Sequence, residues 1–216
     1  MSRIAQIFTD PLSILYTLPA VLIGLTVHEW AHAFAAYKLG DTTARDMGRM
    51  TLNPFAHIDW IGFLSLLLLG FGWAKPVPVN PRNFKNFRRD DIVVSLAGIT
   101  MNLIVAFFAS IIFAVLLYCG IYNAALYTIV QSIIVLNIAL MVFNLIPVYP
   151  LDGSHVFESL FMRKIPKACF FLRQYGMYIL ILVIIVNSQV SFLSTIVSWI
   201  FTGLLSAASW LVGLFF

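Results

Sequence analysis

Two long stretches without charge constrain this chain more than any other feature. No Asp, Glu, Lys or Arg occurs from Ile92 to Leu151, and none occurs in Gln174–Phe216. About 20 consecutive apolar residues span a bilayer, so each stretch is long enough to cross it more than once. Charged residues make up only 10% of the chain, whereas soluble domains contain about 25%. The sequence therefore predicts an all-α polytopic membrane protein.

Five apolar segments are long enough for transmembrane helices, and a sixth, Trp60–Ala74, is marginal. A segment of about 15 residues suits a re-entrant or interfacial element better than a full crossing. Gly48–Leu52 alternates loosely before Asn53-Pro54, which predicts a short strand or β-hairpin. We therefore expect about five to six transmembrane helices, a short β-hairpin and a re-entrant segment. The five longer segments are Leu12–Leu39, Ile92–Cys119, Ala124–Ile146, Tyr175–Val190 and Phe192–Phe215.

The Lys and Arg residues predict the orientation of these segments. Nearly all of them lie in three clusters, whereas the turns Gly120–Asn123 and Asn187–Ser191 contain none. The positive-inside rule places all three clusters in the cytoplasm. Trp60–Ala74 must then enter and leave on one side, with the N-terminus outside and the C-terminus inside. The clusters are Lys38, Arg45 and Arg49; Lys75, Arg82, Lys85, Arg88 and Arg89; and Arg163, Lys164, Lys167 and Arg173.

The same clusters account for the net charge of +4, because basic residues flank membrane spans as topology signals. We therefore expect a multi-pass protein of the cell membrane with no nucleic-acid partner. The sequence contains no internal repeat, and its polar stretches are too short for a separate soluble domain. This predicts one integral-membrane domain over residues 1–216.

The first apolar segment contains His28-Glu29-Trp30-Ala31-His32. Histidines four residues apart lie on one helix face and can bind one metal ion. Glu29 could then act as general base on a metal-bound water. The alternative is a pair of hydrogen-bonded histidines or a proton path. Because ionisable residues are costly inside a membrane and usually functional there, a zinc site is favoured.

A catalytic zinc site needs a third protein ligand. Asp152 is favoured because Pro147 and Pro150 interrupt the preceding apolar segment, and irregular backbone at membrane depth is tolerated only where it lines a cavity. The alternative is an Asp-Gly turn at the membrane surface. With the two histidines, Asp152 would form a two-His, one-carboxylate set that suits hydrolysis. All the candidates are Asp152, His57, His155, Glu158 and Asp59.

The sequence around three further polar residues does not point to a single role. His57 follows Asn53-Pro54, and a structural hydrogen bond is favoured over a contact with substrate or water. His155 is expected to support the site or the local structure. Asn102 is a lone polar residue early in its span, so packing between helices is its expected role and an active-site contact the next.

Two motifs, His28–His32 and Asn144–Gly153, resemble the two signatures of the site-2 protease family. These proteins are intramembrane zinc metalloproteases that cleave transmembrane segments of other proteins. Two more stretches also match, and the resemblance extends over about Leu12–Phe157. Ile99 departs from it, because family members often have Pro at that position. The additional matches are Gly48–Pro54 followed by His57-Ile58-Asp59, and Ala97–Asn102.

The resemblance implies that His28, His32 and Asp152 hold one zinc ion per chain. Glu29 would be the general base, and Asn144 would help to stabilise the oxyanion. The implied activity is zinc-dependent endopeptidase cleavage of transmembrane substrates in the lipid bilayer, as in regulated intramembrane proteolysis. The distribution of Lys and Arg places the active site towards the cytoplasmic side. The implied form is compact, without a PDZ-like or CBS-like domain, with a catalytic core at about 12–157 and C-terminal helices at about 174–216.

Peptide hydrolysis in a membrane requires the substrate helix to unwind, because its carbonyls are otherwise hydrogen-bonded. Gly48–Leu52 could pair with the unwound segment as an added strand. The candidate substrate-binding residues are Gly48, Arg49, Met50, Thr51, Leu52, Asn53, His57 and Asn102.

Two other functions could use the same polar residues. A metal or proton transporter would have polar groups distributed through several spans and often repeated halves, whereas here they cluster and no repeat is found. A catalytically inactive scaffold would have no use for Glu29 beside a metal. Both alternatives are therefore less favoured than the protease.

Overall fold

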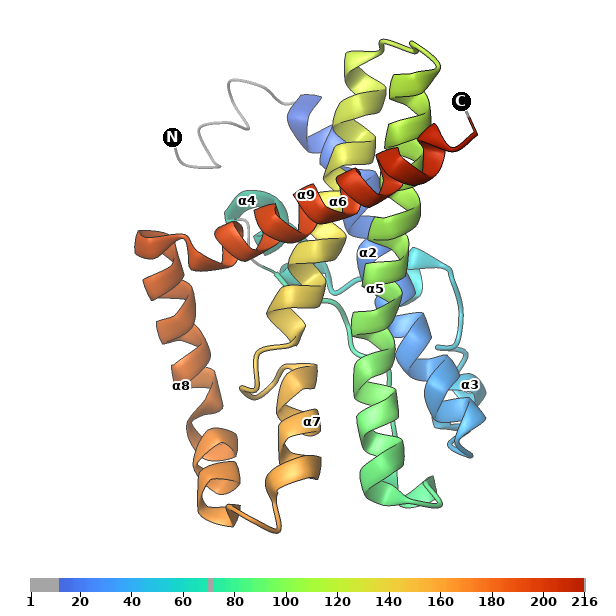
Figure 1. Ribbon diagram of the computed structural model, residues 1–216. Coiled ribbons are helices and arrows are strands. Elements are labelled where there is room, and N and C mark those ends of the chain that lie inside the picture. The colour runs from blue at the N-terminus through green and yellow to red at the C-terminus, as the bar shows by residue number, and fades with distance from the viewer. Residues whose placement is uncertain (1–11, 70–71, 216) are drawn as a thin grey trace.

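A computed structural model describes residues 12–69 and 72–215 (Figure 1). Within these residues the regular structure is helical, as predicted, and the chain is an all-α polytopic membrane protein. The helices are α2 (Leu12–Lys38), α3 (Thr43–Asp46), α4 (Trp60–Leu69), α5 (Phe87–Tyr118), α6 (Ala124–Asn144), α7 (Asp152–Phe161), α8 (Pro166–Val190) and α9 (Phe192–Gly213). Short 3-10 turns occupy Pro54–Ala56 and Pro81–Asn83.

Four of the five predicted spans coincide with helices that are long and apolar enough to cross a membrane, namely α5, α6, α8 and α9. Helix α2 coincides with the fifth. Its 27 residues correspond to about 40 Å at 1.5 Å per residue, which exceeds the roughly 30 Å of a hydrocarbon core. Crossing by α2 stays a prediction.

Helices α2, α5 and α6 pack against one another and form the centre of the protein (Figure 1). Small residues on α5, including Gly98, Ala106 and Ala109, are buried in this contact. Small side chains let helix backbones approach closely in membranes. The close approach brings polar groups of α2 directly against α5. The core cluster comprises Ile99, Ala106, Ala109, Val130, Ile134, Ile138, Met141 and Val142.

The residues that precede and follow α4 in the sequence meet in space. Ile58 and Ala74 form an antiparallel bridge, and the Lys75 N–H donates to the His57 carbonyl at 2.8 Å. The 10 residues of α4 extend only about 15 Å, too little to cross a bilayer. The paired ends therefore support the predicted re-entrant path.

The predicted hairpin at Gly48–Leu52 does not form among the described residues. The chain bends at Met50 and Thr51 without strand pairing, and the one bridge found joins Ile58 to Ala74. The physical reason is that Arg49 Nη2 donates to the Lys75 and Pro76 carbonyls at 2.8 and 3.3 Å. Arg49 thus links this bend to Lys75 and Pro76 through its side chain.

Helix α9 does not return antiparallel to α8 but crosses over α5 and α6 (Figure 1). Ala208 and Val212 pack against Ala114 near the end of α5, and a Cβ at Gly213 would lie 2.9 Å from the Tyr118 hydroxyl. This is the end of α5 opposite Arg88, and the cytoplasmic position of the C-terminus stays a prediction. The positive-inside rule had no signal here, because no Lys or Arg follows Arg173.

Candidate metal centre

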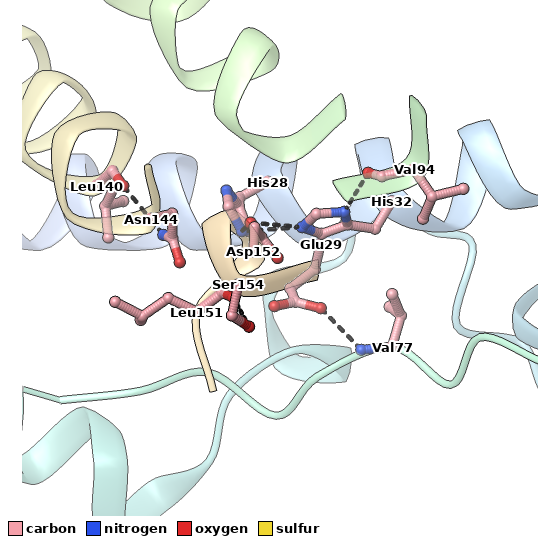
Figure 2. Close-up of polar contacts among 10 residues, drawn as sticks. All are labelled: His28, Glu29, His32, Val77, Val94, Leu140, Asn144, Leu151, Asp152 and Ser154. Atoms are coloured by element: carbon pink, nitrogen blue, oxygen red, sulfur yellow. Dashed lines mark hydrogen bonds and ion pairs between the residues drawn. The ribbon is translucent and has the colours of Figure 1, made fainter. Parts of the chain in front are cut away.

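Helix α2 presents His28 and His32 on one face, toward α5 (Figure 2). Both side chains are buried, with residue exposures of 7% and 8%. The spacing of four residues stacks the imidazoles, and their Nε2 atoms lie 3.0 Å apart. The His32 Nδ1–H donates to the Val94 carbonyl of α5 at 2.8 Å. Because a carbonyl can only accept, His32 Nε2 carries the lone pair that a metal requires.

Helix α7 brings Asp152 to the same point from the other end of the sequence. Asp152 is the first residue of α7, and its Oδ2 lies 3.2 Å from His28 Nε2 and 3.3 Å from His32 Nε2. Gly153 permits this approach, because a Cβ there would lie 2.5 Å from the Leu145 carbonyl oxygen. The start of α7 therefore packs directly against the end of α6, and only glycine fits at that position.

The three atoms fit a zinc ion. In a tetrahedral site with bonds of about 2.0–2.1 Å, ligand atoms lie about 3.3–3.4 Å apart, and the three separations here are 3.0, 3.2 and 3.3 Å. Asp152 Oδ2 is buried and has no hydrogen-bond partner among the described residues. A carboxylate oxygen facing a lone pair of His32 is repelled unless a proton or a metal cation lies between them. The cluster His28, His32 and Asp152 is thus a candidate zinc site.

Glu29 lies beside this cluster but is held by a different part of the chain (Figure 2). Its Oε2 accepts a hydrogen bond of 2.7 Å from the Val77 N–H. Val77 belongs to Lys75–Pro81, called here the proline strap, which is without regular structure up to Asn80 and ends at the 3-10 turn that begins with Pro81. Pro76 and Pro78 fix the strap as extended and have no N–H, so few backbone donors remain in it. One of those donors is directed at Glu29.

A second donor of the strap is directed at another buried carboxylate. The Asn80 N–H donates to Asp41 Oδ2 at 2.7 Å, and Asn83 Nδ2 donates to Asp41 Oδ1 at 2.7 Å. Burial raises the pKa of the Asp41 carboxyl, but hydrogen bonds from Thr43, Asn80 and Asn83 outweigh this and hold that pKa below its ordinary value. Asp41 is therefore a carboxylate at neutral pH, and it anchors the strap to the end of α2.

Sequence reasoning missed the parts played by Asp41, Val77 and Gly98. Gly98 of α5 lies against both imidazoles, because a Cβ there would be 2.5 Å from His32 Nε2 and 2.7 Å from His28 Nδ1. In the sequence, Gly98 is only one residue of the matching stretch Ala97–Asn102, with no sign of a role beside the histidines. The alternation of Pro and Val in the strap was the available signal for Val77, since it limits which residues can donate.

Asn144 lies at the end of α6, near the cluster (Figure 2). One N–H of its amide donates to the Leu140 carbonyl at 3.0 Å, and an amide has two such donors. The other N–H is the group that would donate a hydrogen bond to an oxyanion.

His57 and Asn102 are both buried, with exposures of 1% and 0%. His57 Nε2 donates to the Thr51 carbonyl at 2.8 Å, which fits the favoured structural role and fixes the loop before α4. Asn102 could touch a substrate only if the helices around it separated. Direct substrate contact by these two residues is therefore not supported.

The remaining candidates lie outside the three-atom cluster. His155 Nδ1 is 3.9 Å from Asp91 Oδ1 and half exposed. Glu158 is 3.6 Å from Arg173, and Asp59 Oδ1 accepts from the Ile61 and Gly62 N–H groups at the start of α4. Among Gly48–Asn53, Leu52 is 59% exposed, and Gly48 has a φ of +68°.

Comparisons with known proteins point to a zinc metalloprotease. A family model described as "Peptidase family M50" matches residues 119–186. The chain is 42% identical over 156 residues to "Putative zinc metalloprotease YwhC" of Bacillus subtilis (strain 168), which covers 69% of this chain and 71% of that protein. It is 27% identical over 186 residues to "Putative zinc metalloprotease Rip2" of Mycobacterium tuberculosis (strain ATCC 25618 / H37Rv), covering 83% and 70% of the two chains. No solved structure matches the chain.

Proposed function

Since this chain belongs to peptidase family M50, the site-2 protease family, and is a zinc metalloprotease, we propose that it cleaves peptide bonds within transmembrane segments of other proteins. The observation that carries this proposal is the cluster of His28, His32 and Asp152, whose ligand atoms converge inside a bundle of apolar helices. A transporter is the alternative. Many transporters are built from two repeated halves, and this sequence contains no such repeat.

In this proposal, one zinc ion is held by His28 Nε2, His32 Nε2 and Asp152 Oδ2. Zinc supplies Lewis acidity, which activates water near neutral pH and polarises a carbonyl. The Val94 carbonyl holds the ring of His32 in the required tautomer. Gly98 leaves the space beside the two rings that the ligands need.

Glu29 is proposed as the general base. Its carboxylate takes a proton from the attacking water, whose oxygen forms the new bond to the peptide carbonyl carbon. The same proton is then delivered to the leaving nitrogen as the C–N bond breaks. The Val77 N–H fixes one oxygen of Glu29 and leaves the other free to exchange the proton. The second N–H of Asn144 is proposed to stabilise the negative charge that develops on the carbonyl oxygen.

The substrate is proposed to reach the site from the lipid bilayer. Gly48–Asn53 is kept as the candidate contact for its unwound segment, because this exposed stretch lies against the proline strap through Arg49. The active site is proposed to face the cytoplasmic side of the cell membrane, since α2 ends at Lys38 and α5 begins beside Arg88 and Arg89. Residues 12–157 are proposed as the catalytic core of one domain.

Removal of zinc is expected to abolish cleavage. Purified protein in liposomes is incubated with a single-span substrate, with and without 1,10-phenanthroline, and products are identified by mass spectrometry. We expect cleavage within the apolar segment, complete loss with the chelator, and recovery when zinc is added back. Absence of bound zinc from the active protein, or cleavage that withstands the chelator, would overturn the proposal.

Replacing Val77 with proline is expected to lower kcat by about 10-fold or more, because a hydrogen bond to a charged group contributes about 1.5–3 kcal/mol. Zinc content is expected to stay the same, since Val77 contacts Glu29 rather than a ligand. Val79→Pro is the matched control, because no described hydrogen bond uses the Val79 N–H. Equal activity of Val77→Pro and Val79→Pro would show that the strap does not position Glu29.

A further inference from the structure

The two histidines of the cluster differ in the hydrogen bonding of their Nδ1 atoms. His32 Nδ1 donates to the Val94 carbonyl at 2.8 Å, which fixes its tautomer. His28 Nδ1 is buried and has no hydrogen-bond partner among the described residues. A histidine that binds a metal through Nε2 almost always donates its Nδ1–H to an oxygen. His28 therefore needs an acceptor that the contacts described so far do not supply.

Helix α5 carries a stripe of residues directed at the two imidazoles. Val94, Gly98 and Asn102 are spaced by four and so lie on one face of the helix. Val94 contacts His32, and Gly98 lies against both rings. Helices α2 and α5 run in opposite directions (Figure 1), so moving along α5 from Val94 toward Asn102 means moving along α2 from His32 toward His28. Asn102 is the next member of the stripe on the His28 side.

The position of Asn102 on α5 favours a side chain that leans toward that ring. The Cα–Cβ bonds of a helix tilt toward its N-terminus, so a side chain covers the turn that precedes its own Cα. For Asn102 this is the turn of Gly98, which has no side chain of its own, and His28 Nδ1 lies 2.7 Å from where a Cβ of Gly98 would be. The absence of a side chain at Gly98 thus opens the space between Asn102 and His28.

Asn102, like His28, has buried polar atoms without a hydrogen-bond partner. It is completely buried, and neither its Nδ2 nor its Oδ1 has a partner among the described residues. An unsatisfied buried polar group destabilises the folded protein, so an asparagine with no partner at this position would be unfavourable. One hydrogen bond between the two residues removes the cost for one group on each.

We propose that Asn102 is the positioning residue of His28, its Oδ1 accepting the Nδ1–H of His28 directly or through one bridging water. The bond orients the ring and keeps the lone pair of Nε2 directed at the cluster, as the Val94 carbonyl does for His32. This inference rests on the proposed zinc site and assigns Asn102 a part other than packing or substrate contact.

The test is a comparison of zinc affinity in Asn102→Ala and Asn137→Ala, measured by competition with a chromophoric chelator. Loss of such a supporting partner costs about 10–100-fold in metal affinity, and we expect a loss of this size for Asn102→Ala alone. Asn137 is the control, because it is also completely buried but lies on α6, where its Nδ2 donates to the Ile133 carbonyl at 2.8 Å. Both variants are expected to lower thermal stability.

Two conservative variants separate positioning from packing. Asn102→Asp retains an acceptor oxygen and is expected to restore affinity, whereas Asn102→Leu fills the same space without one and is expected not to. The Co2+-substituted protein gives a second readout, since its visible spectrum reports ligand geometry. Equal zinc affinity of Asn102→Leu and wild type would overturn the inference even if Asn102→Ala fails to fold. Failure of wild-type protein to bind zinc would instead overturn the proposed function.

Discussion

Replacing Glu29 with glutamine is expected to lower the rate of substrate cleavage by at least about 100-fold, because a positioned general base contributes about 10²–10⁴-fold. Glutamine retains an oxygen that can accept the Val77 N–H, so the strap and the local packing should be preserved. The amide cannot take the proton of the attacking water. Cleavage is measured in proteoliposomes with a single-span substrate under single-turnover conditions.

Zinc content is the control for Glu29→Gln. Glu29 lies outside the three-atom cluster, so the variant should bind zinc as wild type does. Normal zinc content with lost cleavage would assign Glu29 to the chemistry rather than to the metal. Cleavage by Glu29→Gln at a rate near that of wild type would exclude Glu29 as the base.

Replacing Gly98 with alanine is expected to weaken zinc binding by about 10–100-fold. The added Cβ would lie 2.5 Å from His32 Nε2 and 2.7 Å from His28 Nδ1, closer than atoms can approach. The rings would have to move apart, and overpacking of this kind costs about 1–3 kcal/mol, where 1.4 kcal/mol is about tenfold in affinity. The measurement is competition for zinc with a chromophoric chelator.

Gly203→Ala is the control for this substitution. Gly203 lies in α9, and a Cβ at that position would meet nothing within 4 Å outside its own stretch of helix. The substitution Gly203→Ala therefore adds the same methyl group to a helix of the same protein without a clash. We expect its zinc affinity and cleavage to equal those of wild type. If Gly98→Ala also binds zinc normally, the two rings are not confined by α5.

The metal cluster was largely predictable from the sequence, because its signals are local. His28, Glu29 and His32 lie within one helical turn, and their spacing alone puts both histidines on one face. Asp152 could be singled out by the prolines that precede it. The long helices were equally predictable, since the apolar runs are uninterrupted by charge.

The parts that escaped prediction depend on contacts between distant segments. The hydrogen bond from Val77 to Glu29 joins residues 48 positions apart, and nothing near either residue specifies the other. Gly98 shapes the site only because α2 and α5 pack closely enough for its missing side chain to matter. The direction of α9 across α5 and α6 was not predictable, because its sequence has no charge to orient it and the direction depends on packing against α5.

The pairing of Ile58 with Ala74 has a consequence for how proteins of this kind can diversify. It ties together the two ends of the segment that contains α4, so residues can be gained or lost between them without moving His57 or the strap. Doubling the length of such a loop costs only about 0.6 kcal/mol of closure entropy. We therefore expect insertions and deletions between Ile58 and Ala74 to disturb His28, His32 and Asp152 less than changes elsewhere in the chain.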